Sequence, residues 1–464
     1  MAKPSAFRIL TVLSNVERKK LLNYLQTKFF SNRKELAPLQ QAWQRMQGKP
    51  MNEEKLFQAA LPKKPFKKRD WYLLLSRLQD ATEDFLGIQR YREDQMQQQL
   101  QVLRAYRRLK LPVFFERSLR QARKFRQKEQ RAEAEMLLWD YQTESEYYNF
   151  IAAPEAGQES NLQAVTDRLD YYFIAEKLRQ ACLAHGRYLA NEEEYEIRYL
   201  DTILDDLEAR PDLFKVPAIV LYATCYQAVV AGGDEQDFLR LRKVLELFRG
   251  RFPTAEIRDV YRLAIDACLR QVHLGKKAFI AETQALYQDS LTGGYLLVDD
   301  HLLPEAFTNI VGLGLQLANY DGVATFIQTY TNELPGPDRE PVTNYNIARL
   351  LHAQEAYAPA LKALEQVDTQ EPFLYIDVRS LQVQIFVELQ EWGTVEKMTV
   401  HLVTYLQRQE KLGRRAEDFS LFLYFCRRLQ QLKPDDTTEA ISLQLEIEET
   451  PSFAEKEWLL GKLK

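Results

Sequence analysis

The clearest pattern of hydrophobic and polar positions in the chain lies in residues 344–372. Two short segments there carry apolar side chains at the i, i+3, i+4 spacing of an amphipathic helix. The stripe residues are Ile347, Leu350 and Leu351 in the first segment and Tyr357, Ala360, Leu361 and Leu364 in the second. Pro359 falls in the first turn of the second helix, where its missing N–H costs nothing. The pattern predicts two antiparallel helices joined by a tight turn.

This segment resembles a tetratricopeptide repeat (TPR). The small, aromatic, small and proline positions of that family match Ala348, Tyr357, Ala360 and Pro372, whereas Asn344 and Glu355 replace its tryptophan and turn glycine. The resemblance implies antiparallel helix pairs stacked in a right-handed superhelix, because one pair cannot bury its own apolar faces. It also implies a concave groove that binds a protein or peptide. The expected groove residues are Tyr345, Asn346 and Arg349.

Small or β-branched apolar residues recur around this segment at the spacing of a helix-pair repeat. The steps between them are 43, 43, 43, 37, 35 and 43 residues. Such periods are typical of helical solenoids. We therefore expect an all-α chain with a TPR-like α-solenoid of seven helix pairs over residues 161–464. The positions are Cys182, Cys225, Cys268, Val311, Ala348, Val383 and Cys426, and the aromatics that follow in three units are Tyr320, Tyr357 and Trp392.

Residues 1–88 form an N-terminal basic helical block in this interpretation. Ser14 with Glu17 has the pattern of a capping box, and Asn52 precedes a further short helix. The block resembles the opening of a group of helical bacterial proteins without an assigned activity, which supports a fold more than a function. The shared pieces are Phe29-Phe30, Lys55-Leu56-Phe57, Leu61-Pro62 and Asp84-Phe85-Leu86.

Residues 89–160 are expected to form a long helical hairpin joining the two regions. Its first helix should end before Pro112, and its second should run from Val113 to about Phe150. At the other end of the chain, residues 441–447 alternate apolar and polar side chains and are compatible with a strand. We favour a helix because the neighbouring residues are helix formers and no partner strand is present. Residues 453–463 should then cover the last repeat.

Charge is divided unevenly along the chain. Residues 1–135 hold 30 Lys and Arg against 14 Asp and Glu, whereas the remainder holds 32 against 52. A basic front on an acidic body is compatible with attraction between the two regions, which we favour, or with nucleic-acid binding. The candidate phosphate contacts are Lys63, Lys64, Lys67, Lys68, Arg69, Arg120, Arg123 and Lys124. Trp71 begins an apolar helical stripe and is expected in the core.

Motifs for catalysis are missing from the sequence. The five histidines are isolated, and no cysteine or histidine spacing matches a metal site. Gly312 and Gly314 lack the third glycine of a nucleotide loop and should mark close helix packing. The four cysteines occupy the repeat positions and should pack as small buried hydrophobes. We therefore expect no enzyme, no cofactor and no metal.

The first hypothesis is a cytoplasmic protein-interaction scaffold, and the alternative is a regulatory, nucleic-acid-associated protein. The N-terminus lacks the apolar run of a signal peptide, and residues 217–231 are too short to span a bilayer, so no membrane contact is expected. Neither the partner's identity nor the oligomeric state follows from the sequence.

Overall fold

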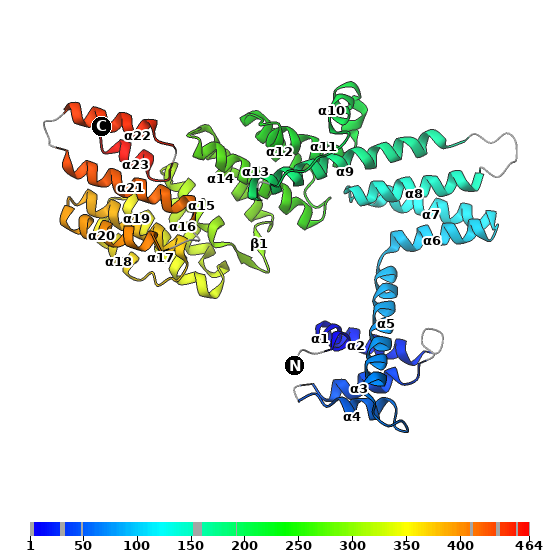
Figure 1. Cartoon of the computed structure of the whole chain (residues 1–464). Helices are drawn as coiled ribbons and strands as arrows, with labels where there is room; N and C mark the ends of the chain where they lie inside the picture. Colours follow the sequence, from blue (N-terminus) through cyan, green and yellow to red (C-terminus); the bar gives the residue numbers. More distant parts are fainter. Residues whose placement is uncertain are drawn as a thin grey trace. The chain divides into compact units, whose positions relative to one another are not determined.

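The structure is a computed structural model that describes residues 4–27, 33–47, 50–151, 160–191, 193–408, 412–432, 437–451 and 453–463. Within these ranges it is almost entirely helical, with α1 to α23, short 3-10 and π segments and one two-stranded hairpin (Figure 1). The all-α prediction is confirmed. The chain divides into two compact units, Met1–Glu129 with Trp139–Thr166 and Gln130–Leu138 with Asp167–Lys464.

The first unit opens with five helices around one apolar core. The expected capping box is present, because the Glu17 N–H donates to Ser14 Oγ and the Ser14 N–H donates to the Glu17 carboxylate. Asn52 caps its helix through the Lys55 N–H. Trp71 is fully buried, as predicted. These helices are α1 (Ser5–Val12), α2 (Asn15–Gln26), α3 (Leu36–Arg45), α4 (Glu53–Ala60) and α5 (Lys68–Glu93). Phe29-Phe30 of the bacterial resemblance lies outside the described residues.

Three further helices follow α5, which runs through the expected segment boundary at residues 88–89. They are α6 (Gln95–Arg108), α7 (Pro112–Lys128) and α8 (Ala134–Ile151), and α6 packs against α7. The prediction of one helix from Val113 to Phe150 is wrong, because the chain leaves the helix at residues 129–133. There the Ala132 N–H donates to the Arg251 carbonyl (2.8 Å), and Arg251 Nε donates to the Gln130 carbonyl (3.0 Å). Long-range hydrogen bonds thus satisfy the backbone that a continuous helix would have paired locally.

The second unit is built from alternating helices, here called A helices (α9, α11, α13, α15, α17, α19 and α21) and B helices (α10, α12, α14, α16, α18, α20 and α22). The pairs in order are α9 (Leu162–Asn191) with α10 (Leu200–Ala209), α11 (Pro217–Cys225) with α12 (Glu235–Leu247), α13 (Thr254–His273) with α14 (Ala278–Thr292), α15 (Pro304–Gln316) with α16 (Tyr320–Tyr330), α17 (Gly336–Ala353) with α18 (Tyr357–Glu365), α19 (Pro372–Glu388) with α20 (Trp392–Leu406), and α21 (Arg414–Gln431) with α22 (Thr437–Glu449); α23 (Lys456–Gly461) closes the chain. A short 3-10 turn (Pro211–Lys215), a π segment (Tyr226–Val230), a 3-10 turn (Thr331–Glu333) and the β1–β2 hairpin (Leu297–Val298, His301–Leu302) lie between helices.

The predicted positions of the repeat are confirmed. All seven of its positions fall on successive A helices, and each side chain is at most 1% exposed. The expected aromatics open their helices, since α16 begins at Tyr320, α18 at Tyr357 and α20 at Trp392. The A helices α15, α17 and α19 each pack on their own B helix and on the next A helix (Figure 1). This is the nearest-neighbour contact pattern of a helical solenoid.

Four consecutive A-to-B turns share one hydrogen-bonding arrangement. At the turn after α17, the Glu355 N–H donates to the His352 carbonyl and the Ala356 N–H donates to the Leu351 carbonyl, both at 2.9 Å. This is a Schellman motif, which requires a residue with positive φ. Glu355 supplies it with φ 60° in place of the glycine of the TPR family. The residues at this position in the four turns are Gly275, Ala318, Glu355 and Gln390.

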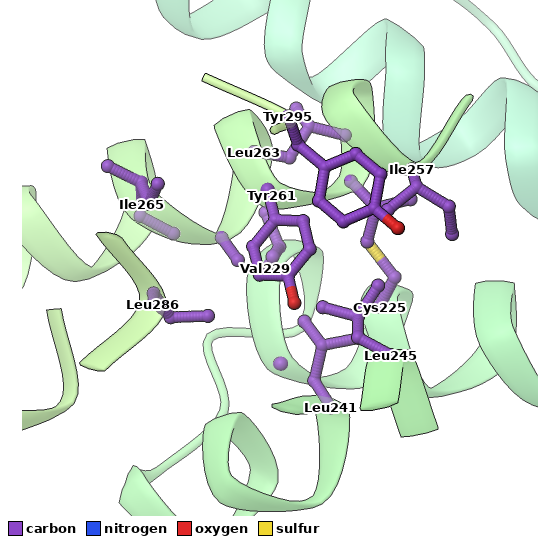
Figure 2. Packing of buried hydrophobic residues seen from close by; sticks show 14 of the residues in the cluster. Cys225, Val229, Leu241, Leu245, Ile257, Tyr261, Leu263, Ile265, Leu286 and Tyr295 are labelled. Atoms are coloured by element: carbon purple, nitrogen blue, oxygen red, sulfur yellow. The ribbon is translucent and has the colours of Figure 1, made fainter. Parts of the chain in front are cut away.

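Buried apolar residues of the second unit form clusters that each extend across several consecutive helices. Figure 2 shows part of the core around α11 to α14, where the Tyr261 and Tyr295 rings stack at 5.4 Å beside Cys225 and Leu286. Gly312 and Gly314 mark close packing, as expected. A Cβ on them would lie 2.6 Å from Arg349 Nη2 and 2.5 Å from Val323 Cγ2, respectively.

The chain's end is helical rather than extended. In α22, Leu443 and Ile447 are buried while Ile441 and Leu445 are exposed, so the alternating pattern belongs to one helix with an apolar edge. Phe453 and Leu459 are buried at the last repeat, as the expected closing segment requires. The expected segments 1–88, 89–160 and 161–464 stay a prediction beside the two compact units.

Candidate functional site

A cavity of about 690 Å³ lies on the A-helix side of the second unit. Its described lining comes from α13, α15, α17, α19 and α21 and from Ala454 and Glu455 before α23, with no residue from a B helix. The apolar part includes Leu269, Val272 and Leu381, and the polar part includes Asn309, Gln316, Gln384 and several charged groups. We call this cavity the A-helix groove.

The three groove residues expected on α17 lie in different environments. Tyr345 and Arg349 line the groove, and the Arg349 guanidinium lies 5.6 Å from the centre of the Tyr345 ring. Asn346 is fully buried instead. Its Nδ2 donates to Thr308 Oγ1 (3.1 Å), and its Oδ1 accepts a hydrogen bond from Arg349 Nη1 (3.0 Å). Asn346 therefore holds α15 and α17 together and orients Arg349 from behind. Their role in binding stays a prediction.

A second charged cluster lies in the groove beyond α17 and joins three elements. Arg415 of α21 donates through Nη2 to Asp377 Oδ1 of α19 (2.6 Å) and to Glu455 Oε1 (3.3 Å). Ser380 Oγ of α19 donates to the same Glu455 oxygen (2.7 Å). These bonds fix the segment before α23 onto the last two A helices. We call these four residues the Arg415 cluster.

Burial sets the protonation of these groups. It raises the pKa of Glu455, which Arg415 and Ser380 lower only in part. Burial alone would lower the pKa of Arg415, but Glu455 and Asp377 hold it above its ordinary value. Burial also raises the pKa of the Tyr345 phenol and lowers that of the His352 imidazole. Near neutral pH, Arg415 stays charged while Tyr345 and His352 stay neutral.

One oxygen of the Arg415 cluster is unsatisfied. Glu455 Oε2 is shielded from solvent and has no hydrogen-bond partner among the described residues. A buried acceptor without a partner costs free energy on the order of 1–3 kcal/mol. The cluster therefore contains a polar atom whose hydrogen bonding would improve if a donor reached it.

The sequence did not point to the Arg415 cluster. Asp377 and Arg415 are 38 residues apart, which is close to the repeat spacing, so adjacent repeats were the only signal that placed them together. Glu455 lies a further 40 residues from Arg415, in a segment expected only to cover the last repeat. Polar groups at such distances are joined by stacking of the repeats and not by any local motif.

The basic segment before α5 is partly neutralised. Lys64 pairs with Asp70 at 2.9 Å, and Lys68 pairs with Glu53 at 2.5 Å while lying over the Tyr72 ring. The other three candidate cations of this segment, Lys63, Lys67 and Arg69, belong to no ion pair found among the described residues.

The candidate cations on α7 also divide into those held in an ion pair and those that are not. Arg123 forms a two-pronged ion pair with Glu144 (2.9 and 3.0 Å) and lies over the Tyr147 ring. Arg120 and Lys124 are exposed, and neither is in an ion pair within the part of the chain that the structure describes. Two of the three α7 candidates therefore offer free charge, and the third is held by the protein itself.

The cysteines are structural by their surroundings. All four are reduced and buried. Burial raises the pKa of the Cys268 and Cys426 thiols. The pKa of the Cys182 thiol is raised mainly by its hydrogen bond with Cys225 and also by burial. The thiolate form of these three cysteines is therefore disfavoured. Across the described ranges, no three or more His, Cys, Asp and Glu side chains gather so as to hold a metal ion. None of the described helices is long and apolar enough to cross a bilayer.

Comparison with known proteins adds no relative to these observations. No family model matches the chain. A search of curated proteins and a search of solved structures likewise return no significant match. The geometry described above therefore has to carry the functional argument.

Proposed function

We propose that this chain is a non-enzymatic scaffold that binds a segment of a partner protein in the A-helix groove of a TPR-like, right-handed superhelix. The observation that carries the proposal is that the groove is lined by A helices and by the segment before α23, with no B helix among its described lining. Its volume of about 690 Å³ is within the range of sites that hold small ligands or a few side chains of a peptide. A groove of this kind recognises a peptide by burying some side chains and fixing others through polar anchors.

The groove offers both parts of such recognition. Leu269, Val272 and Leu381 provide apolar surface at separate places along it. Asn309, Gln316 and Gln384 provide amide groups that donate and accept hydrogen bonds. An extended or helical segment exposes backbone and side-chain groups that match both kinds of surface.

The arginines of the groove are held before any partner arrives. Arg349 is fixed by the Thr308 carbonyl (2.8 Å) and Asn346, and Arg415 is fixed by Asp377 and Glu455. Side chains already ordered lose less conformational entropy on binding. Preorganised polar groups therefore favour a specific partner over adventitious contacts.

The test is selection of peptides from a random library on the immobilised full chain. Gln316 lines the groove and is exposed, so Gln316→Trp should obstruct it without disturbing a buried contact. Gln328 is exposed on the B helix α16 and lines no part of the groove, so Gln328→Trp is the matched control. Selected peptides should bind the Gln316→Trp variant at least about tenfold more weakly and the control equally well. Peptides that bind both variants as tightly as the unchanged chain would refute groove binding.

Nucleic-acid association is the alternative, and it is supported by the free charges of Arg120 and Lys124. Ion pairs at Lys64, Lys68 and Arg123 reduce the charge available to phosphate. Binding to DNA or RNA that falls steeply between low and moderate salt would favour this alternative.

A further inference from the structure

The turn between α6 and α7 leaves four apolar side chains exposed to solvent. Leu109 is 60% exposed, Leu111 37%, Val113 73% and Phe114 52%. The core side of α7 is formed by other residues, including the buried Phe115 and Leu119. Contiguous apolar groups left in water, rimmed by polar ones, mark a surface of interaction. We call residues 109–114 the hairpin tip.

The hairpin tip is held in one conformation. Lys110 adopts φ 56°, and a Schellman motif closes α6 through hydrogen bonds from the Lys110 N–H to the Arg107 carbonyl (3.1 Å) and from the Leu111 N–H to the Tyr106 carbonyl (3.0 Å). The Tyr106 and Phe114 rings lie 5.8 Å apart across the turn. The tip therefore presents its apolar side chains from a fixed backbone.

Positive charge surrounds the tip and continues along α7. Between positions 108 and 128, Glu116 is the only acidic residue. Val113, Arg117, Arg120 and Lys124 follow one another at helical spacing, and all four are exposed. The six exposed cations in this region that belong to no ion pair among the described residues are Arg108, Lys110, Arg117, Arg120, Lys124 and Lys128.

We propose that the hairpin tip and the α7 cations bind the surface of an anionic lipid bilayer, with the tip inserted among the lipid headgroups. The occupant has to accept aliphatic side chains at one end and supply negative charge beside them. A bilayer interface with anionic lipids has both properties.

Nucleic acid fits this surface less well. Phosphates would account for the cations, but three of the four apolar tip residues are aliphatic and cannot stack on bases. The expectation of no membrane contact was based on the lack of a spanning segment, and an interfacial tip needs none.

The experiment is flotation of the full chain with phosphatidylcholine vesicles and with vesicles in which part of that lipid is replaced by phosphatidylserine. The chain should bind the anionic vesicles and bind the neutral ones at least tenfold more weakly, an estimate from the ~1 kcal/mol that each basic residue contributes near an anionic surface. Arg117→Ala/Arg120→Ala/Lys124→Ala should weaken binding to anionic vesicles on the order of 100-fold. Leu109→Ser/Val113→Ser should weaken it by about tenfold or more. Leu247→Ser/Leu274→Ser, at exposed positions of the second unit, is the matched control and should bind as the unchanged chain does.

Insertion is measured separately with a polarity-sensitive dye. Because the four native cysteines are buried, a dye can be attached to Val113→Cys or, as a control, to Leu274→Cys. Emission should shift to the blue on adding anionic vesicles only for the dye at position 113. An unshifted dye, no vesicle binding at low salt, or binding of single-stranded RNA without vesicle binding would each overturn the proposal. Vesicle binding should be unchanged by Gln316→Trp, which separates this surface from the A-helix groove.

Discussion

The two units of this chain bury their helices by different means. In the second unit, a small or β-branched residue recurs at one place on every A helix, and Cys225, Cys268 and Ala348 are fully buried there. In the first unit, aromatic rings pack between helices, as in the Phe7–Trp43 stack at 5.7 Å and the Phe115–Phe150 stack at 4.1 Å. A repeated small residue gives a period that can be read from the sequence, whereas single aromatic contacts give none.

Charge differs between the units in a related way. In the second unit, partly buried ion pairs such as Arg415–Asp377 join neighbouring repeats. In the first unit, Arg104 and Arg107 share the carboxylate of Glu146 at 3.1 and 2.8 Å, while Arg120 and Lys124 are left exposed. In the acidic unit, Arg415 thus links neighbouring repeats. The basic unit retains free cations on its surface.

Substitutions that remove buried side-chain atoms should destabilise the first unit most. Phe115→Ala deletes a fully buried ring and leaves a cavity beside Phe150, which should cost about 3–5 kcal/mol. Hydrogen exchange followed by mass spectrometry would report this as lost protection in α6 to α8. The exposed neighbour provides the control, since Phe114→Ala should change protection little. Equal effects of the two variants would contradict the aromatic packing described here.

Substitutions that enlarge a buried small residue should destabilise the second unit. Ala348 is fully buried among Ala360, Leu364 and Val378, so Ala348→Leu would overfill the junction of α17, α18 and α19 at a cost of about 1–3 kcal/mol. Urea unfolding monitored by hydrogen exchange of peptides from α17 and α18 measures the loss. Ala358 is exposed on the same helix as Ala360, and Ala358→Leu should be nearly neutral. A stable Ala348→Leu variant would mean that the recurring small position does not mark a close crossing of helices.

The smallest effect should be the same in both units, because both use the same turn. Glu355 and Lys110 adopt positive φ, a conformation that strains a residue with a Cβ atom. Glu355→Gly and Lys110→Gly should each stabilise the adjoining helices by up to about 1 kcal/mol, seen as a higher urea midpoint for local exchange. Gly275 has φ 81°, and a Cβ added there would meet no atom within 4 Å, so Gly275→Ala tests the backbone strain alone. It should be destabilising, and a neutral outcome would remove the strain argument from all three turns.

Local sequence determined the elements whose physical cause is also local. Ser14 and Asn52 cap their helices because a side-chain oxygen meets a backbone N–H three residues away. Tyr357 opens α18 and Ala348 lies at the helix crossing because helical spacing and repeat period both place them there. Residues 441–447 form a helix, because a strand without a partner strand has no inter-strand hydrogen bonds to stabilise it.

Tertiary structure decided what depends on partners distant in the sequence. The break between α7 and α8 follows from hydrogen bonds with Arg251, more than a hundred residues away. Asn346, expected as a groove residue, is instead fully buried and donates a hydrogen bond to Thr308 of the preceding repeat. Arg415 and Glu455 meet only once the last repeats are stacked. Periodicity specifies which face of a helix is buried, but the partner of each polar group is chosen by the packing of the whole unit.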